Sequence, residues 1–435
     1  MKRLSLGILA LVSACSAPPP MMGGVGGGGA IEPNEIEVTA DITGDTTWKT
    51  GKTYILKQLT YVTAGTLTIE PGTTILGDRT SALIVTRDAK LRAEGTKEQP
   101  IVFSSSAPQG TRDTENWGGL VLNGRARINV TGGENNSEGV ADEPRNKYGG
   151  TDDAHECGVL KYVRVEFAGR PLTADNELNG ITLNGCGSAT LLDYVQVHRG
   201  KDDGIELFGG KANLKHIVIT GSDDDGLDWD QGWTGKAQFV VIQQLNGYGN
   251  YGIEADNNRT NHDLLPRSAP TLYNVTLVGR NPDTTPSEGP SRGVIFREGT
   301  AATLANAIVM NFTSAGLVVD KTSTAAQWTG GSLVVRNSVF HNNPSVGWQN
   351  FVLMPDNMFD EAMALSDTSL SNRQVDPELT APTAAAPSWK PQAGSPVLTG
   401  GATPPGDGFF DTTATFVGAI GADDWTVGWT TMPNN

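Results

Sequence analysis

The stretch Gly226-Leu227-Asp228-Trp229-Asp230 decides the fold, because its pattern of a glycine with apolar residues at the first and third positions after it returns along the chain. Between Gly180 and Gly252 the successive glycines are 24, 22 and 26 residues apart. A repeat of this length predicts a solenoid, whose units bury their apolar faces only by stacking on their neighbours. The other copies begin at Gly119, Gly180, Gly204, Gly252, Gly293 and Gly316.

A second series of apolar runs lies between the glycine stretches. Its members are Tyr162-Val163-Arg164-Val165, Tyr194-Val195-Gln196-Val197, His216-Ile217-Val218-Ile219, Phe239-Val240-Val241-Ile242 and Tyr273-Asn274-Val275-Thr276-Leu277. Two or more strands per repeat predict an all-β parallel β-helix, in which equivalent strands stack roughly 4.8 Å apart. The first and third residues after each glycine should face inward, so that Trp229 stacks on Ala255 in the core.

The amino terminus has the organisation of a bacterial secretory signal, with Lys2 and Arg3 before an apolar run over residues 4–12. Val12-Ser13-Ala14-Cys15 resembles the lipobox of bacterial lipoproteins, in which the cysteine is acylated and becomes the first mature residue. We therefore expect a signal peptide over residues 1–14 and lipid on Cys15, with an ordinary cleaved signal as the alternative. Ser16 after the cysteine favours, by the same resemblance, an outer-membrane lipid anchor that faces the periplasm or the cell surface.

The remaining chain divides into three parts. Residues 15–33 are rich in Gly, Pro, Ala, Ser and Met, which cannot bury enough apolar surface to fold, so they predict a flexible tether. The β-helix is expected over residues 34–397, beginning with a capping strand. A Pro- and Ala-rich break and a new apolar pattern then predict a C-terminal cap over residues 398–435.

Charge excludes one class of partner. The formal net charge is −16, and it becomes −18 once residues 1–14 are removed together with Lys2 and Arg3. A field of this sign repels polyanions, so nucleic acid and anionic lipid headgroups are poor partners. Cations and neutral glycans remain open as ligands.

The three cysteines divide by expected role. With Cys15 assigned to lipid, Cys157 and Cys186 remain for a disulfide, which persists in the oxidising compartments outside the cytoplasm. Two separate buried thiols are the alternative.

Six further motifs are specific in combination: Gly65-Thr66-Leu67-Thr68-Ile69-Glu70-Pro71-Gly72-Thr73, Pro100-Ile101-Val102-Phe103, Trp117-Gly118-Gly119, Tyr148-Gly149-Gly150, Asp202-Asp203-Gly204-Ile205-Glu206 and Phe409-Phe410-Asp411. Together they resemble a family of secreted and surface-anchored β-helix proteins of Gram-negative bacteria over nearly the whole mature chain. The resemblance implies a right-handed parallel β-helix of the general pectate-lyase type. It brings no catalytic assignment with it.

Acidic residues gather at the outward positions of the glycine stretches. If the first and third residues face the core, the second residues place Glu206, Asp228 and Glu254 in one outer column, and the fourth residues place Asp230 beside Asp256. Like charges about 5 Å apart repel by roughly 1 kcal/mol even in water, so the column needs compensation. Adjacent turns add the carboxylates of Asp202, Asp203, Asp223, Asp224 and Asp225.

Three kinds of compensation fit this pattern: a bound cation, a nearby base, or a carboxyl group that keeps its proton. Calcium suits clustered carboxylates and turn carbonyls, because it accepts 6 to 8 oxygen ligands in loose geometry. We therefore predict a Ca²⁺ site with ligands drawn from Glu206, Asp228, Glu254, Asp230, Asp256, Asp203 and Asp225. Arg199, Lys201 and Lys236 are close enough in sequence to neutralise the acids instead. The turn aspartates also have an ordinary structural explanation, because Asp-Asp-Gly is common turn chemistry.

Two classes of function remain. A binding or structural module is favoured by the anchor, the tether, the rigid stack and the long excursions over residues 131–157 and 257–270, which can wall a groove. An enzyme is the alternative: paired carboxylates such as Asp203 and Asp225 serve as acid and base on a glycosidic bond, and a lyase would use Lys201 or Lys236 as its base. Fold analogy alone is weak support for either enzyme.

Other chemistries lack their motifs, since the sequence has no Gly-x-Ser-x-Gly elbow, His-Glu-x-x-His motif or phosphate-binding glycine loop. His198 is at an outward position and is expected to be solvated, while Trp233 fits either a sugar platform or a turn-packing aromatic. We predict a calcium-supported module that binds glycans or the cell envelope. A lyase or glycoside hydrolase that acts on a uronate-type polymer is the alternative.

Overall fold

The computed structural model describes residues 34–171, 178–280, 291–343, 359–384 and 386–433. Cys15, the signal peptide and the tether lie outside the described residues. Within those ranges, no helix has the length and apolar character needed to cross a bilayer.

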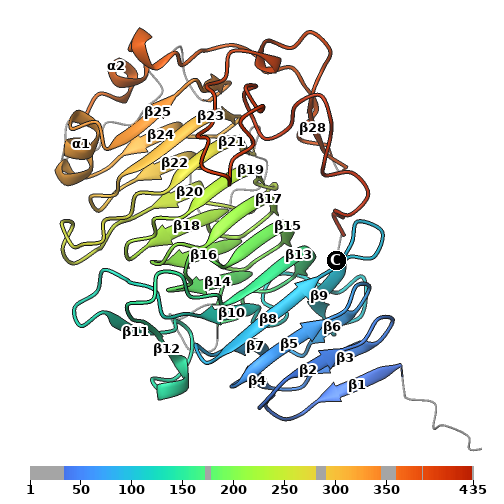
Figure 1. Ribbon diagram of the computed structural model, residues 1–435. Coiled ribbons are helices and arrows are strands. Elements are labelled where there is room, and N and C mark those ends of the chain that lie inside the picture. The colour runs from blue at the N-terminus through green and yellow to red at the C-terminus, as the bar shows by residue number, and fades with distance from the viewer. Residues whose placement is uncertain (1–33, 172–177, 281–290, 344–358, 385, 434–435) are drawn as a thin grey trace, which may run out of the picture. The chain divides into compact units, whose positions relative to one another are not determined.

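Two parallel sheets form a stack of coils (Figure 1). The nine-stranded sheet consists of β4 (Leu59–Val62), β7 (Ala82–Val85), β10 (Leu120–Asn123), β14 (Ile181–Asn184), β16 (Ile205–Phe208), β18 (Leu227–Asp230), β20 (Tyr251–Ala255), β22 (Arg292–Phe296) and β24 (Ala315–Val319). Each strand after the first pairs with its counterpart one coil earlier, so the predicted parallel β-helix is confirmed.

The fifteen-stranded sheet forms the other faces of the coils. Its strands are β1 (Glu35–Val38), β2 (Thr46–Trp48), β3 (Thr53–Leu56), β5 (Gly65–Ile69), β6 (Thr74–Gly77), β8 (Ala89–Glu94), β9 (Ile101–Ser105), β13 (Gly158–Glu166), β15 (Leu191–His198), β17 (Asn213–Thr220), β19 (Lys236–Gln243), β21 (Thr271–Val278), β23 (Ala302–Met310), β25 (Leu333–Arg336) and β26 (Val339–His341). Its long strands bend at one residue of positive φ, as at Tyr162, Tyr194 and His216. These corner side chains stack, with ring centroids 4.5 Å apart for Tyr162 and Tyr194.

The apolar core runs through the stacked coils, as the glycine stretches predict. The first and third residues after each glycine are buried, and Trp229 pairs with Ala255 in the register of β18 and β20. The glycines are needed because adjacent coils approach closely at these positions. A Cβ on Gly226 would lie 2.6 Å from the carbonyl oxygen of Gly252 and 2.3 Å from Ile242 Cγ2. Any other residue would push the coils apart.

Two helices lie at the last coil, α1 (Thr322–Thr329) against β25 and α2 (Glu361–Leu365) against β24 (Figure 1). Glu361 accepts a hydrogen bond from the backbone N–H of Val319, 3.0 Å away in the final strand of the nine-stranded sheet. This contact satisfies one backbone donor at a strand edge, where unpaired groups otherwise invite association.

The segment over residues 398–433, predicted as an end cap, packs along the outer face of the larger sheet instead. Trp429 is buried, with its ring centroid 5.8 Å from that of Tyr162 and 6.0 Å from that of Tyr194. Gln196 donates to the carbonyl oxygen of Thr431 at 2.6 Å and accepts from its N–H at 3.0 Å. The segment follows β27 (Leu379–Ala381) and β28 (Ser388–Pro391), an antiparallel pair.

The same segment buries His198, so the prediction of a solvated side chain is wrong. Its Nδ1 lies 2.7 Å from Thr220 Oγ1 and its Nε2 lies 3.1 Å from the carbonyl oxygen of Pro433. Burial lowers the pKa of His198 to about 4. The repeat pattern in the sequence could not reveal this contact, because Pro433 is more than 230 residues away from His198 in sequence.

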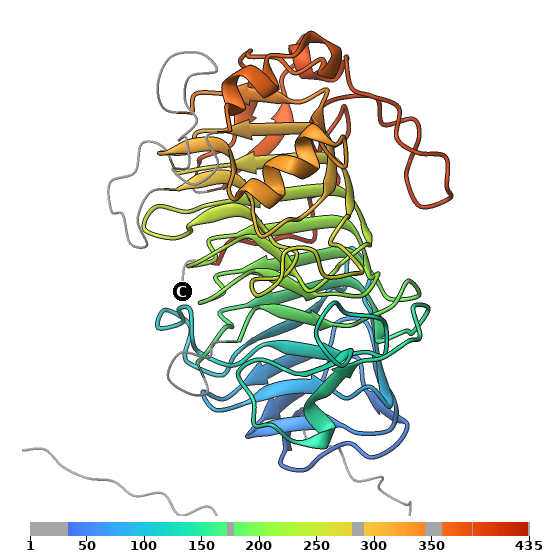
Figure 2. The same ribbon diagram turned by 90° about the vertical axis from the view of Figure 1, so that its left-hand side faces the viewer.

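The predicted disulfide between Cys157 and Cys186 is confirmed, with Cα atoms 5.6 Å apart. It joins the end of the excursion after β10 to the turn that follows β14. The excursion carries a small antiparallel hairpin of β11 (Glu134–Asn136) and β12 (Lys147–Gly149), which stands out from the stack in Figure 1 and faces the viewer in Figure 2.

Candidate functional site

The outward acids form the column that the sequence predicts. Glu206 pairs with Asp228 in the register of β16 and β18, and Asp228 pairs with Glu254 in that of β18 and β20. The column is largely covered, since Glu206 is only 7% exposed. The excursion with the β11–β12 hairpin packs on the same face, where Tyr148 contacts Phe208 of β16.

The turn aspartates link one coil to the next through backbone hydrogen bonds. Asp203 Oδ1 accepts from the N–H of Asp225 at 3.0 Å, and Asp225 Oδ1 accepts from the N–H of Tyr251 at 2.6 Å. Asn179 begins the series, because its Oδ1 accepts from the N–H of Asp203 at 3.1 Å. The structural explanation of these turn residues therefore holds for Asp203 and Asp225, each with one carboxylate oxygen used in this way.

Three predicted ligands converge on one point. Asp203, Glu206 and Asp228 each offer a carboxylate oxygen, and these oxygens lie within 4.8 Å of one another. Asn179 Nδ2 donates to Glu206 Oε2 at 2.6 Å. Asp228 Oδ1 is buried and has no hydrogen-bond partner. A buried charged oxygen without a partner costs free energy, so this position favours a ligand that supplies positive charge. A second group of oxygens, from Asp202, Asp203 and Asp224, satisfies the same distance limit.

Burial and mutual repulsion perturb the whole column. Burial, followed by repulsion from neighbouring carboxylates, raises the pKa values of Asp203, Glu206 and Asp228 well above their usual range. Burial also raises the pKa of Asp230 to about 7 and that of Glu254 to about 7. The carboxyl groups of the column therefore keep their protons more readily than free carboxyl groups do, unless a cation compensates their charge.

A cation that the sequence analysis did not single out supplies part of this compensation. The Arg297 guanidinium pairs with Glu254, and its Nε lies 2.8 Å from Asp256 Oδ1. Although burial opposes it, these two carboxylates raise the pKa of Arg297 above its ordinary value. Glu254 and Asp256 are thus engaged by a protein side chain, and they are less suited to metal binding than Asp203, Glu206 and Asp228.

Of the basic residues suspected from the sequence, Lys201 pairs with one of the turn aspartates, as predicted, whereas Lys236 and Arg199 pair with acids elsewhere. Lys201 Nζ lies 2.7 Å from Asp223, and Lys236 Nζ lies 2.6 Å from Asp407 on the C-terminal segment. Arg199 lies 3.3 Å from Asp113. Lys236 therefore belongs to the opposite side of the coil from the acidic column, which corrects the expectation that it neutralises those acids.

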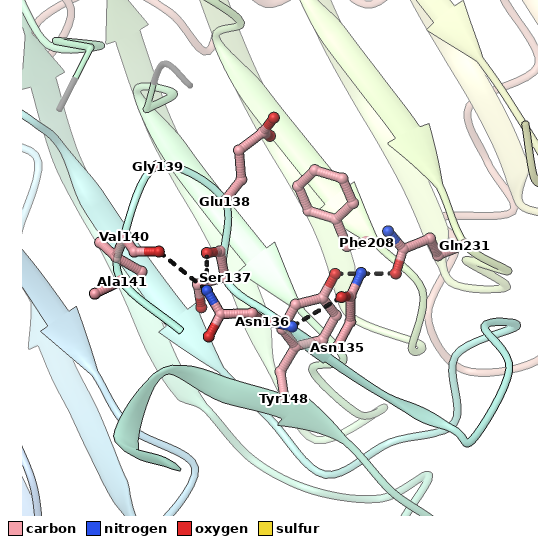
Figure 3. A pocket seen from close by; sticks show the side chains of 10 residues that line it. All are labelled: Asn135, Asn136, Ser137, Glu138, Gly139, Val140, Ala141, Tyr148, Phe208 and Gln231. Carbon is pink, nitrogen blue, oxygen red and sulfur yellow. Dashed lines mark hydrogen bonds between the residues drawn. The ribbon is translucent and has the colours of Figure 1, made fainter. Parts of the chain in front are cut away.

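A pocket of 480 Å³ opens beside the column, between the hairpin excursion and the nine-stranded sheet (Figure 3). Phe208, 8% exposed, and Tyr148, 1% exposed, form the aromatic part of its wall, while Asn135 and Gln231 supply amide groups. The Tyr148 hydroxyl lies 2.9 Å from Gln231 Oε1, which holds both side chains in place. Glu138 also lines the pocket, and its charge contributes to the raised pKa of Glu206. The pocket and the acidic column are therefore neighbours.

Trp233 is fully buried and donates to the carbonyl oxygen of Ala212 at 3.0 Å, so it packs the turn and is no sugar platform. The excursion over residues 131–157, predicted as a groove wall, does line this pocket, whereas the other predicted wall, residues 257–270, contributes none of its lining residues. The sequence analysis did not single out individual side chains of the 131–157 excursion, because they belong to no repeat.

Comparison with known proteins identifies the family. The chain matches the model of a pectate-lyase like beta helix domain over residues 40–389, and it therefore belongs to that family. The crystal structure of pectate lyase Pel9A is similar over 89% of this chain and 86% of that chain, at 10% sequence identity and a TM-score of 0.41. No curated protein matches the sequence.

Proposed function

We propose that this β-helix is a glycan-binding module, anchored by lipid on Cys15 to the outer membrane and supported by Ca²⁺ at the cluster of Asp203, Glu206 and Asp228. The observation that carries the proposal is the unpartnered, buried Oδ1 of Asp228 within that cluster. A divalent cation would satisfy this oxygen and relieve the repulsion among three carboxylates.

The neighbouring pocket supports a sugar ligand. Carbohydrates combine apolar ring faces with many hydroxyl groups, and the pocket combines the aromatic side chains of Tyr148 and Phe208 with the amides of Asn135 and Gln231. A neutral glycan can use the pocket alone. A uronate polymer carries negative charge, so it needs the cation to bridge its carboxylates to the acidic column.

The alternative is a lyase or glycoside hydrolase that acts on a uronate-type polymer. One observation favours it: buried acids with raised pKa values, such as Asp203 and Glu206, are suited to the role of general acid at neutral pH. A lyase base is harder to assign, because Lys201 and Lys236 are both paired with aspartates.

Calorimetric titration with neutral oligosaccharides and with oligogalacturonate, in calcium and in a chelator, tests the proposal. We expect saturable binding that Phe208→Ala weakens and that Phe409→Ala, at the C-terminal segment, leaves unchanged. Absence of binding to both ligands would overturn the proposal. Appearance of unsaturated products or new reducing ends would establish the enzymatic alternative instead.

A further inference from the structure

Three side chains from separate segments meet at the last coils of the stack, on the side that carries α1. His262 Nδ1 lies 2.7 Å from Ser323 Oγ, and His262 Nε2 lies 2.5 Å from Glu298 Oε2. His262 belongs to the excursion over residues 257–270, Glu298 to the turn after β22, and Ser323 to the first turn of α1. A hydroxyl, an imidazole and a carboxylate joined in this order are the parts of an activated nucleophile.

The arrangement is held by a dense set of hydrogen bonds. The carbonyl oxygen of His262 accepts from Asn257 Nδ2 at 2.9 Å and from Arg267 Nη1 at 2.8 Å, which fixes the backbone that carries the imidazole. The N–H of Gly299 donates to Thr324 Oγ1 at 2.9 Å, so the turn with Glu298 is tied directly to the residue after Ser323. Three separate segments are thereby locked at one place.

Glu298 is one of the residues with positive φ that recur along the chain. Glu298 has φ 54°, a left-handed conformation that is unfavourable for a residue with a side chain. The conformation directs a mostly buried carboxylate, with a side chain 12% exposed, toward a histidine whose side chain is 30% exposed. The carboxylate is thus covered while the imidazole remains accessible to a ligand.

We propose that Ser323 and His262 are the catalytic residues of a serine-esterase site, and that Glu298 is a positioning residue that orients the imidazole. Ser323 Oγ attacks the acyl carbon of a carboxylic ester and passes its proton to His262 Nδ1. The bond between the acyl carbon and the alcohol oxygen breaks, and that oxygen takes the proton from His262. Water then attacks the acyl-serine and gives its proton to His262, and the proton returns to Ser323 Oγ as the carboxylic acid leaves.

The first turn of α1 supplies a donor for the oxyanion that forms during this reaction. The first N–H groups of a helix have no partner within the helix, and none of the backbone bonds described for the chain uses the N–H of Ser323. An N–H on the nucleophile's own residue points toward the oxygen of the attacked carbonyl group in many acyl-transfer sites. The net charge of −16 favours neutral or cationic esters as substrates.

Covalent labelling of the full chain with a fluorophosphonate tests the assignment, followed by peptide mapping. We expect a single adduct on Ser323, lost in Ser323→Ala and slowed at least about 100-fold in His262→Asn, with parallel losses of 4-nitrophenyl acetate hydrolysis. His341→Asn is the matched control, because His341 has the same 30% side-chain exposure and pairs with Asp376. It should leave labelling unchanged.

The role of Glu298 needs its own measurement. Glu298→Gln should slow labelling without changing the unfolding temperature, and Glu298→Asp should recover part of the rate. The labelled residue is identified in the parent protein, so its identification does not depend on whether any variant folds. An adduct on another residue, no adduct, or equal labelling of the parent and His262→Asn would overturn the proposal.

Discussion

Replacing Asp230 by Asn should remove a large pH-dependent cost from the fold. Burial raises the pKa of Asp230 from 3.8 to about 7, so the folded chain binds a proton more tightly than the unfolded chain does. Stability from this residue is fully present below pH 4 and is lost as the pH rises through 7. A shift of about 3 units corresponds to about 4 kcal/mol.

Asn is the appropriate replacement because its amide oxygen can still accept the hydrogen bond that Asp230 Oδ1 takes from the N–H of Gln231 at 2.5 Å. In a calcium chelator, we expect Asp230→Asn to raise the free energy of unfolding by up to about 4 kcal/mol at pH 8.5 and to change it little at pH 4. Urea unfolding at several pH values measures this directly. Exposed Asp423→Asn is the control. A variant with the parent's stability at pH 8.5 would refute the reasoning.

Three other changes test the ion pairs of Arg297, the disulfide and the apolar core, respectively. Arg297→Gln leaves the buried carboxylates of Glu254 and Asp256 without their cation, so urea unfolding at pH 8 should show a loss of about 3–5 kcal/mol. Replacing both disulfide cysteines by Ser opens a link that spans 29 residues, and calorimetry should show a loss of about 3.5 kcal/mol if chain entropy dominates. Trp229→Ala leaves a cavity in the core column, and it should cost about 3–5 kcal/mol by urea unfolding, whereas no loss would contradict the inward orientation.

The fold was predictable because a β-helix repeats one local rule. The glycine positions, the inward residues and the neighbours Trp229 and Ala255 all follow from a single spacing in the sequence. Contacts that lie outside the repeat could not be predicted in this way. Trp429 packs on Tyr162 and Tyr194, which are more than 230 positions away in sequence, and the glycine repeat carries no information about this contact.

The candidate site was predictable in part. The register that places Glu206 beside Asp228 came from the glycines, but the burial of the column came from an excursion without a repeat. Arg297 could have been found, because it is the fourth residue after Gly293, the same position that Asp230 and Asp256 occupy after their glycines. Proximity in sequence wrongly favoured Lys236, because residues in one coil can face opposite sides.

Calcium titration by calorimetry tests the central claim most directly. The parent chain should bind Ca²⁺ with a saturable heat and release protons on binding, because the raised pKa values of Asp203, Glu206 and Asp228 favour protonated carboxyl groups that the cation must displace. A triple variant with Asp203→Asn, Glu206→Gln and Asp228→Asn keeps the shapes of the three side chains and removes their negative charges. The account predicts no saturable heat from this variant. Equal heats from the two proteins would contradict it.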